Sequence, residues 1–239
     1  MSPPAYRFDR VDSTMDVVHA LAEKGAEEGT AVLALEQLEG RGSRGRFWHS
    51  PPGGLWMSVL FRPPVTGGIE VISLRVGLAV AEGLDPLLHE PIRLKWPNDL
   101  MLGERKVGGI LCEARWQGHA VGWVAVGIGL NVRNPVPAEL TDSATWLALN
   151  QPEMTPDSVS EPLMTVLRKL NLSPVVLTGD ELERFAQRDW LRGRELRAPA
   201  VGIASGISPD GALIVRRKDG TGVSVRSGSI ELATVHSPR

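Results

Sequence analysis

The feature that most constrains the fold is an alternation of strand-like and helix-like segments that runs from Tyr6 to about Ile128. Short apolar runs rich in β-branched residues predict strands, whereas apolar residues that recur every three or four positions predict helices. Strands are expected at residues 30–35, 55–61, 92–96, 106–113 and 121–128. Helices are expected after an N-cap at Ser13, across residues 71–81, and near residues 158–170 and 180–190. This alternation predicts a mixed core of helices and strands, not an all-helical or all-β chain.

After Trp190 the alternation of helix-like and strand-like segments ends, and short β-prone runs follow one another. Asp210-Gly211 and Asp219-Gly220 interrupt these runs and are typical of hairpin turns. We therefore expect a larger domain of residues 1–190 and a small β domain of residues 191–239. Because so small a β domain has little stability alone, it is expected to pack on the larger one.

Composition argues against several classes of function. The 239 residues carry a formal net charge of −2, which argues against a general nucleic-acid binder. Cys112 is the single cysteine and the five histidines show no i,i+4 pairing, so no metal site built on these side chains is expected. Residues 1–10 are polar with both charge signs, and no apolar run reaches membrane-spanning length. We therefore expect no signal peptide, no membrane segment and a cytoplasmic location.

Residues 40–48, Gly-Arg-Gly-Ser-Arg-Gly-Arg-Phe-Trp, concentrate three arginines and three glycines in nine positions. Neighbouring guanidinium groups repel one another, and a polyanionic ligand is the simplest compensation. The spacing of Gly40, Gly42 and Gly45 matches a dinucleotide-binding fingerprint, but the following residues 49–52, His-Ser-Pro-Pro, cannot begin a helix. No Gly-Lys-Ser or Gly-Lys-Thr closes the segment, which excludes a Walker A loop. A local anion site and a solvated basic loop remain as alternatives.

Three further clusters carry charge or glycine near expected strand ends. Residues 95–99, Lys-Trp-Pro-Asn-Asp, are consistent with a plain turn after a strand or with polar side chains that project into a cleft. Residues 106–109 and 127–131 place glycines in neighbouring strands, where a ligand or another backbone comes close. Two strands interrupted in this way indicate one shared pocket wall, although single glycine bulges are common in sheets.

In this order the motifs resemble the biotin protein ligases, whose pattern includes Gly-Arg-Gly-x-Arg-Gly-Arg, Lys-Trp-Pro-Asn-Asp, Arg-Lys-x-x-Gly-Ile-Leu and Gly-x-Gly-x-Asn. The resemblance is strong over residues 12–131 and continues weakly through the C-terminal β module. It implies an α+β fold, with a mixed β-sheet flanked by helices as in the class II synthetase core, and a small SH3-like β-barrel. It also implies that biotin is activated by ATP to biotinyl-5'-AMP and transferred to a lysine of a biotin carboxyl carrier protein. Mg²⁺ is expected to arrive with ATP.

The resemblance assigns roles to individual residues. Lys106 is expected to be the key catalytic lysine, which bridges the biotin carboxylate and the α-phosphate, and Arg41 and Arg44 are expected to assist it. The expected biotin-binding residues are Ser13, Thr14, Met15, Gln37, Gly40, Arg41, Gly42, Ser43, Trp56, Ser58, Lys106, Gly109, Gly127 and Gly129. The expected ATP-binding residues are Arg41, Arg44, Arg46, Trp48, Lys95, Asn98 and Asn131.

Three positions depart from the family pattern. Met15 stands where many relatives have asparagine, and Trp56 where several have tyrosine. Ser43 occupies a position that is often arginine. The missing guanidinium at Ser43 predicts that this chain retains the adenylate less tightly than a relative that has it.

Two other functions compete with this one. A lipoate or octanoyl ligase shares the fold and the lysine, but the Arg-Arg-x-Ser-Gly-Gly-Gly loop of that family is absent here. A biotin-sensing repressor needs a winged helix before the Ser13 helix, and residues 1–12 leave no room for one. We therefore expect no DNA and no membrane partner, and a monomer or a weak homodimer.

Overall fold

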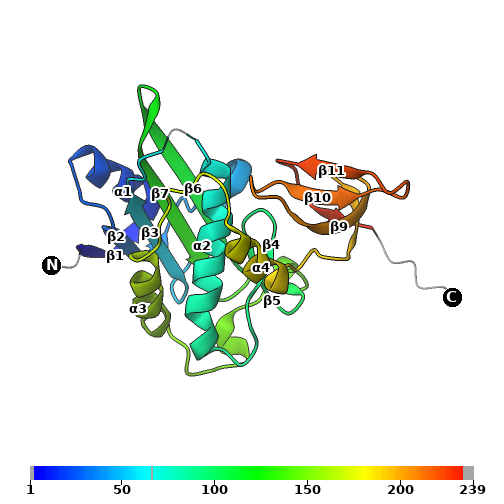
Figure 1. The fold of residues 1–239 in the computed structure, drawn as a ribbon. Helices are drawn as coiled ribbons and strands as arrows, with labels where there is room; N and C mark the ends of the chain where they lie inside the picture. Colours follow the sequence, from blue (N-terminus) through cyan, green and yellow to red (C-terminus); the bar gives the residue numbers. More distant parts are fainter. Residues whose placement is uncertain (1–2, 66, 234–239) are drawn as a thin grey trace.

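The structure is a computed structural model that describes residues 3–65 and 67–233 of the chain. Its elements form two β-sheets, with the α-helices packed around the larger one (Figure 1). The larger sheet contains β1 (Ala5–Val11), β2 (Ala31–Gln37), β3 (Leu55–Phe61), β4 (Arg93–Lys95), β5 (Asp99–Leu102), β6 (Arg105–Gln117) and β7 (Ala120–Leu130). The smaller sheet contains β8 (Glu195–Ala198), β9 (Gly202–Ile207), β10 (Leu213–Arg216), β11 (Gly222–Val225) and β12 (Glu231–Leu232). The α-helices are α1 (Thr14–Glu23), α2 (Ile69–Leu84), α3 (Pro156–Leu167) and α4 (Gly179–Arg188), and short 3-10 turns occupy Ser43–Gly45, Asp85–Leu87, Ala138–Leu140 and Leu147–Leu149. Among the described helices, none has both the length and the apolar character needed to cross a membrane.

The larger sheet has the strand order β1-β2-β3-β7-β6-β5-β4. β1 pairs with β2 in parallel and the other neighbours pair antiparallel, so the sheet is mixed, as expected. Successive side chains of a strand point to opposite faces. Val32 and Leu60 accordingly pack with α1, whereas Leu33 and Val59 join the core formed with α2 and α3. The sheet is thus covered on both faces, and its middle strands are buried.

The expected strands and helices of the larger domain are confirmed, with ends that shift by a few residues. The Ser13 hydroxyl caps α1 by accepting a hydrogen bond from the Met15 amide at 3.3 Å, and Gly25 follows the helix with a φ of 84°. The sheet has two further strands, β1 and β5, that the sequence pattern did not predict. β1 is an edge strand with exposed residues on both faces, and β5 has 4 residues. Neither strand therefore carries a readable alternation of apolar and polar positions.

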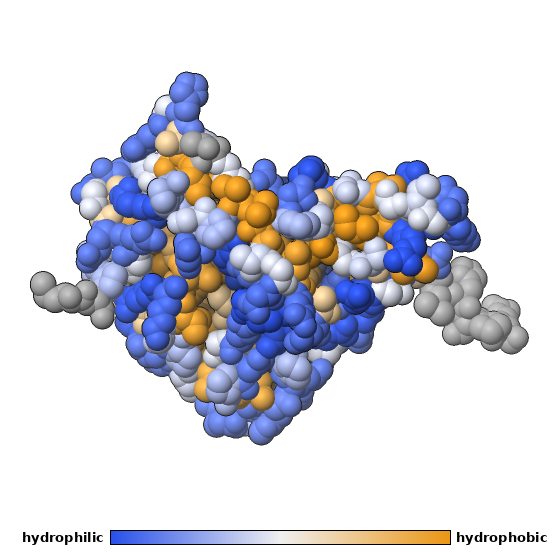
Figure 2. Space-filling view, in the orientation of Figure 1, coloured by the Kyte–Doolittle hydropathy of each residue, from blue (hydrophilic) through white to orange (hydrophobic). Residues whose placement is uncertain are grey.

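The smaller sheet has the order β11-β10-β9-β8-β12 and is antiparallel throughout. Gly211 and Gly220 adopt φ values of 82° and 84° at its turns, which confirms the expected hairpins. The Trp96 indole donates a hydrogen bond to the Gly211 carbonyl at 2.9 Å, and Leu213 belongs to the same hydrophobic core as α2. Hydrophobic residues gather where this sheet adjoins the main body (Figure 2). The small domain therefore packs on the larger one, as expected, while a boundary between residues 190 and 191 stays a prediction.

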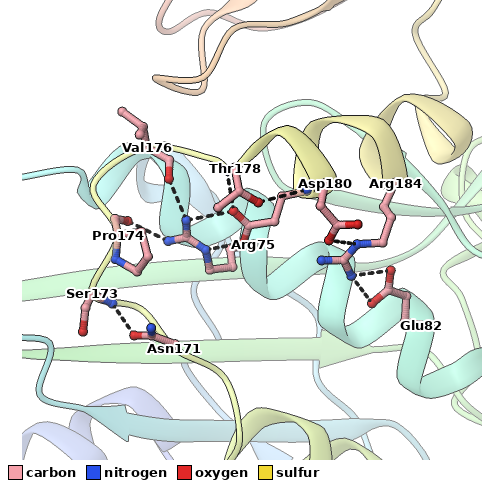
Figure 3. A network of polar contacts seen from close by, with 10 residues as sticks. Arg75, Glu82, Asn171, Ser173, Pro174, Val176, Thr178, Asp180 and Arg184 are labelled. Carbon is pink, nitrogen blue, oxygen red and sulfur yellow. Dashed lines mark hydrogen bonds and ion pairs between the residues drawn. The ribbon is translucent and has the colours of Figure 1, made fainter.

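A buried arginine joins α2 to the segment before α4 (Figure 3). The Arg75 side chain is 2% exposed and donates to both carboxylate oxygens of Glu181, at 2.5 and 3.1 Å. It also donates to the carbonyls of Pro174 and Val176, each at 2.9 Å. Glu181 in turn caps α4 together with Thr178. One side chain thus fixes the path of the chain from α3 to α4.

Candidate functional site

A cavity of about 720 Å³ lies between the start of α1, loop 37–49, strands β3, β6 and β7, and loop 134–144. A volume of this order suits a small-molecule ligand. The predicted site residues that line it are Ser13, Thr14, Met15, Gln37, Arg41, Gly42, Ser43, Arg46, Trp48, Ser58, Lys95, Asn98, Lys106, Gly109, Gly127, Gly129 and Asn131. The fold therefore brings together residues that lie far apart in the sequence.

One part of the cavity wall is a cluster of uncharged polar side chains. The Gln37 side-chain oxygen accepts hydrogen bonds from the Thr14 amide at 2.9 Å and from its hydroxyl at 3.0 Å. The hydroxyls of Thr14 and Ser58 are 2.8 Å apart, and Ser58 is fully buried. The Gln37 amide nitrogen donates to the Ser50 hydroxyl at 2.9 Å. Since α1 begins here, this cluster can offer both donors and acceptors to an uncharged polar group of a ligand.

Lys106 occupies the wall formed by β6. Its ammonium group lies 2.5 Å from an Asp99 carboxylate oxygen and 5.0 Å from the centre of the Trp48 ring. Its backbone is held by the end of loop 134–144 and the residue that follows it, since its amide donates to the Ser143 carbonyl and its carbonyl accepts from the Thr145 amide. The lysine therefore presents a positive charge at a fixed point in the cavity.

The two glycine-containing strands lie side by side, because Gly109 of β6 is paired with Gly129 of β7. A Cβ atom at Gly129 would lie 2.6 Å from the Trp48 indole nitrogen, and one at Gly127 would lie 2.9 Å from the Met15 sulfur. A side chain at position 129 would therefore displace the rigid Trp48 ring from the cavity wall, whereas at position 127 the flexible Met15 side chain would have to shift. At Gly109 a Cβ atom would make only ordinary contacts, so the same argument does not apply there.

The arginine-glycine loop forms one rim of the cavity. The Arg41 guanidinium binds both carboxylate oxygens of Asp16 at 2.8 Å, and its backbone forms a bridge with Phe47. The hydrogen bond to Asp16, opposed in part by burial, raises the pKa of Arg41. Arg46 donates to the carbonyl and the hydroxyl of Ser43, at 3.3 and 3.1 Å. Two of the three arginines of the loop thus line the cavity.

The residues expected to bind ATP form another part of the wall. The Lys95 ammonium lies 5.2 Å from the centre of the Trp190 ring. Burial lowers the pKa of Lys95, an effect that Asp99 partly offsets, so an incoming anion would favour the charged form. Asn98 and Asn131 use their side-chain nitrogens to bind the backbone carbonyls of Ile110 and Thr145, at 2.7 and 3.0 Å. These two asparagines shape the wall as well as line it.

Three predicted site residues do not line the cavity. Trp56 is 1% exposed, and its indole donates to the Pro51 carbonyl at 2.9 Å, so it packs behind the wall instead of beside the ligand space. Arg44 adopts a positive φ of 62° and donates to the Ser229 hydroxyl of the C-terminal domain at 2.5 Å. Gly40 is buried against the Trp48 carbonyl and the Ser50 hydroxyl. Their contacts with a ligand stay predictions.

The structure adds lining residues that the sequence reasoning missed. They include Phe47, Glu104, Trp190 and loop residues 135–137, 139, 140 and 142–144. Asp99, which belongs to the run 95–99 that one interpretation placed in a cleft, also lines the cavity. The run Asn134-Pro135-Val136-Pro137, which follows Asn131, is typical of a loop after a strand end and was the available signal. Across the described ranges 3–65 and 67–233, no three His, Cys, Asp or Glu side chains are grouped to hold a metal ion.

The sequence and the fold match known ligases. A model of the Biotin/lipoate A/B protein ligase family matches residues 7–131, and a model of the biotin protein ligase C terminal domain matches residues 192–233. The chain therefore belongs to the biotin/lipoate A/B protein ligase family, with the C-terminal domain of the biotin protein ligases.

Individual relatives agree with this assignment. The chain is 32% identical over 237 residues to the bifunctional ligase/repressor BirA of Bacillus subtilis, a match that covers 94% of this chain and 72% of that protein. It is 41% identical over 128 residues to the biotin--[acetyl-CoA-carboxylase] ligase of Paracoccus denitrificans, covering 52% of each. The biotin protein ligase of Aquifex aeolicus, solved in complex with biotin and ATP, superposes with a TM-score of 0.79 at 28% identity, covering 96% of this chain and 98% of that chain.

Proposed function

We propose that the protein activates biotin with ATP, forming biotinyl-5'-AMP and pyrophosphate, and then transfers biotin to a lysine of a carrier protein. The observation that carries this proposal is the placement of Lys106 in the same cavity as the uncharged cluster of Thr14, Gln37 and Ser58. A cyclic urea needs both donors and acceptors, and a carboxylate that must react with a phosphate needs a fixed positive charge.

In the first step an oxygen of the biotin carboxylate attacks the α-phosphorus of ATP and pyrophosphate leaves. Both reactants are anionic, so the barrier depends mainly on neutralising charge and on holding the two groups in line. Lys106, Lys95 and Arg46 line the cavity and supply that charge. Mg²⁺ would arrive on the phosphates and neutralise them further, and the carboxylates of Asp99 and Asp142 in the wall are oxygen ligands of the kind that it accepts.

In the second step the neutral amine of the carrier lysine attacks the acyl carbon of biotinyl-5'-AMP. A carbon–nitrogen bond forms, the bond between the acyl carbon and the phosphate oxygen breaks, and AMP leaves while the amine loses a proton to solvent. The Lys106 ammonium can stabilise the negative charge that develops on the acyl and phosphate oxygens. The same residue therefore serves both steps.

Biotin is expected to support ATP–pyrophosphate exchange with a kcat/KM at least about 10³-fold above that of lipoate or octanoate. Those acids have no polar group for the cluster of Thr14, Gln37 and Ser58, so its buried hydroxyls and amide would lose hydrogen bonds to solvent without replacement. Exchange of radiolabelled pyrophosphate into ATP, measured with each acid in turn, tests this. Comparable exchange with lipoate would show that the protein is the lipoate-type ligase.

Replacing Ser43 by arginine is expected to slow the release of biotinyl-5'-AMP by about tenfold, since a guanidinium can form charge-assisted hydrogen bonds with the phosphate. Ser43 lines the cavity, where its hydroxyl now only accepts a bond from Arg46. Release of the radiolabelled adenylate through a filter would measure the rate. Ser43→Gln, which adds length without charge, is the matched control, and unchanged release in Ser43→Arg would refute the prediction.

We propose that the acceptor is the biotin carboxyl carrier domain of a carboxylase, since the Paracoccus denitrificans relative is named for acetyl-CoA carboxylase. We also propose a cytoplasmic location, a monomeric or weakly dimeric state, and no general affinity for DNA. The net charge of −2 over the chain supports the absence of general affinity for DNA.

A further inference from the structure

Glu113 is a carboxylate of β6 that the proposed reaction does not use. Its side chain is 24% exposed and lies on the same strand as Lys106. One carboxylate oxygen lies 3.1 Å from His19 Nε2, and the other lies 3.5 Å from Arg41 Nε. Arg115 approaches more loosely, at 3.8 Å. Glu113 therefore connects a buried histidine to the first arginine of loop 40–48.

A buried chain of hydrogen bonds orients this carboxylate. The indole nitrogen of Trp123, which can only donate, lies 2.9 Å from His19 Nδ1. Nδ1 must then be the acceptor, which leaves the proton of the neutral imidazole on Nε2, where it is donated to Glu113. His19 is 6% exposed and Trp123 is 7% exposed, so both rings are held by the packing around them. The hydrogen bond from His19, with the charges of Arg41 and Arg115 and against the effect of burial, holds the pKa of Glu113 below its ordinary value.

Arg41 is held from a second side by Asp16, in the first turn of α1. Its two terminal nitrogens each bind an Asp16 oxygen at 2.8 Å, while its Nε faces Glu113. All three guanidinium nitrogens thus face carboxylates, and few donors remain for a phosphate. The backbone of Arg41 also bridges to Phe47, which closes the base of the loop.

We propose that Glu113 and Asp16 are positioning residues that hold Arg41 as the anchor of loop 40–48, so that Arg41 fixes the loop at the cavity mouth instead of binding phosphate. The inference rests on the proposed biotin ligase function and revises the expected catalytic role of Arg41. An anchored loop loses less conformational freedom when it covers a ligand, so the anchor slows ligand escape without touching the reacting atoms.

The test uses Glu113→Gln and Asp16→Asn in the full chain. The first substitution keeps an acceptor oxygen for His19 but removes the charge that faces Arg41, and the Asp16 side chain is 55% exposed, so both variants are expected to fold. Each variant is expected to release biotinyl-5'-AMP about fivefold faster, an effect of the size of a partly exposed charged hydrogen bond. The rate of adenylate formation in a single turnover at saturating biotin and ATP is expected to stay within about twofold, because the reacting atoms keep their contacts.

A double-mutant cycle separates positioning from a general structural effect. If Glu113 acts through Arg41, Glu113→Gln has no further effect on release in an Arg41→Gln background. Glu36→Gln, which removes the partner of Arg10 at 2.7 Å on the surface, is the matched control and is expected to be silent. The proposal would be overturned if the variants released biotinyl-5'-AMP at the wild-type rate, or if Glu113→Gln still sped release in the Arg41→Gln background. A fall in the rate of adenylate formation with unchanged release would overturn it as well.

A second readout does not depend on the reaction. Limited trypsin digestion should cleave after Arg44 or Arg46 about fivefold faster in Glu113→Gln and Asp16→Asn than in the wild type or Glu36→Gln, because an unanchored loop opens more often. Equal cleavage would count against the anchor. If the wild-type protein makes no biotinyl-5'-AMP but the two variants are still cleaved faster than it is, the proposed function is refuted and the anchor still stands.

Discussion

Replacing Lys106 by alanine is expected to lower biotin-dependent ATP–pyrophosphate exchange by about 10²–10³-fold, the usual cost of removing one group that stabilises transition-state charge. The ammonium group lies in the cavity wall, 2.5 Å from an Asp99 carboxylate oxygen. Without it the developing charge between the biotin carboxylate and the α-phosphate loses a fixed partner. Transfer of biotin to a carrier domain from added biotinyl-5'-AMP should fall as well, because the same charge serves the second step.

The measurement is exchange of radiolabelled pyrophosphate at saturating ATP and biotin, with Lys169→Ala as the control. Lys169 is an exposed lysine beyond the end of α3 and is expected to be replaceable without effect. Binding of biotin alone, followed by calorimetry, should weaken much less than exchange, because the variant loses the partner of the carboxylate but the cluster around Thr14 still holds the ring. Near-wild-type exchange by Lys106→Ala would refute the assignment of this lysine.

Replacing Arg75 by methionine is expected to destabilise the protein by about 3–5 kcal/mol, the range found when one partner of a buried ion pair is removed. The loss leaves Glu181 without its main partner and the carbonyls of Pro174 and Val176 without a donor. Glu181 is charged at neutral pH, because its hydrogen bonds to Arg75 and Thr178 lower its pKa against the opposing effect of burial. Urea unfolding followed by tryptophan fluorescence measures the free energy of unfolding.

Arg184→Met is the matched control on the same helix pair. Arg184 likewise links the two helices, by binding the carboxylates of Glu82 and Asp180, but its side chain is 39% exposed (Figure 3). Its removal is therefore expected to cost no more than about 1 kcal/mol. Equal stabilities of the Arg75→Met and Arg184→Met variants would contradict the view that burial makes the first pair important.

Much of the site could be predicted because its motifs are local. The run of residues 40–48, the lysine at 106 and the glycines at 127 and 129 each stand out in a short window of sequence. The lysine, the two glycines and most of the run line the cavity. Hydrophobic periodicity likewise located most strands of the larger sheet and its helices, because the backbone geometry of each element repeats over a few residues.

Other site residues could not be judged from a local pattern. Trp56 and Ser58 point to the same face of β3, since they are two positions apart. Only Ser58 lines the cavity, because the Trp56 indole turns to the Pro51 carbonyl. Arg44 and Arg46 are equally charged and two residues apart, yet a positive φ at Arg44 directs its guanidinium to Ser229. Periodicity does not distinguish such neighbours.

The sequence by itself therefore determined most of the secondary structure, the mixed fold and the residues expected to carry the chemistry. The contacts that orient those residues were not predictable from the sequence. Arg41 contacts Asp16 of α1 and Glu113 of β6, and the backbone of Lys106 bonds to Ser143 and Thr145 at the end of loop 134–144. These partners come from separate elements, and their distances depend on how the sheet and helices pack around one core. Local patterns report the burial and geometry of single elements, whereas the partner of a charged side chain is set by long-range packing, which the tertiary structure alone displays.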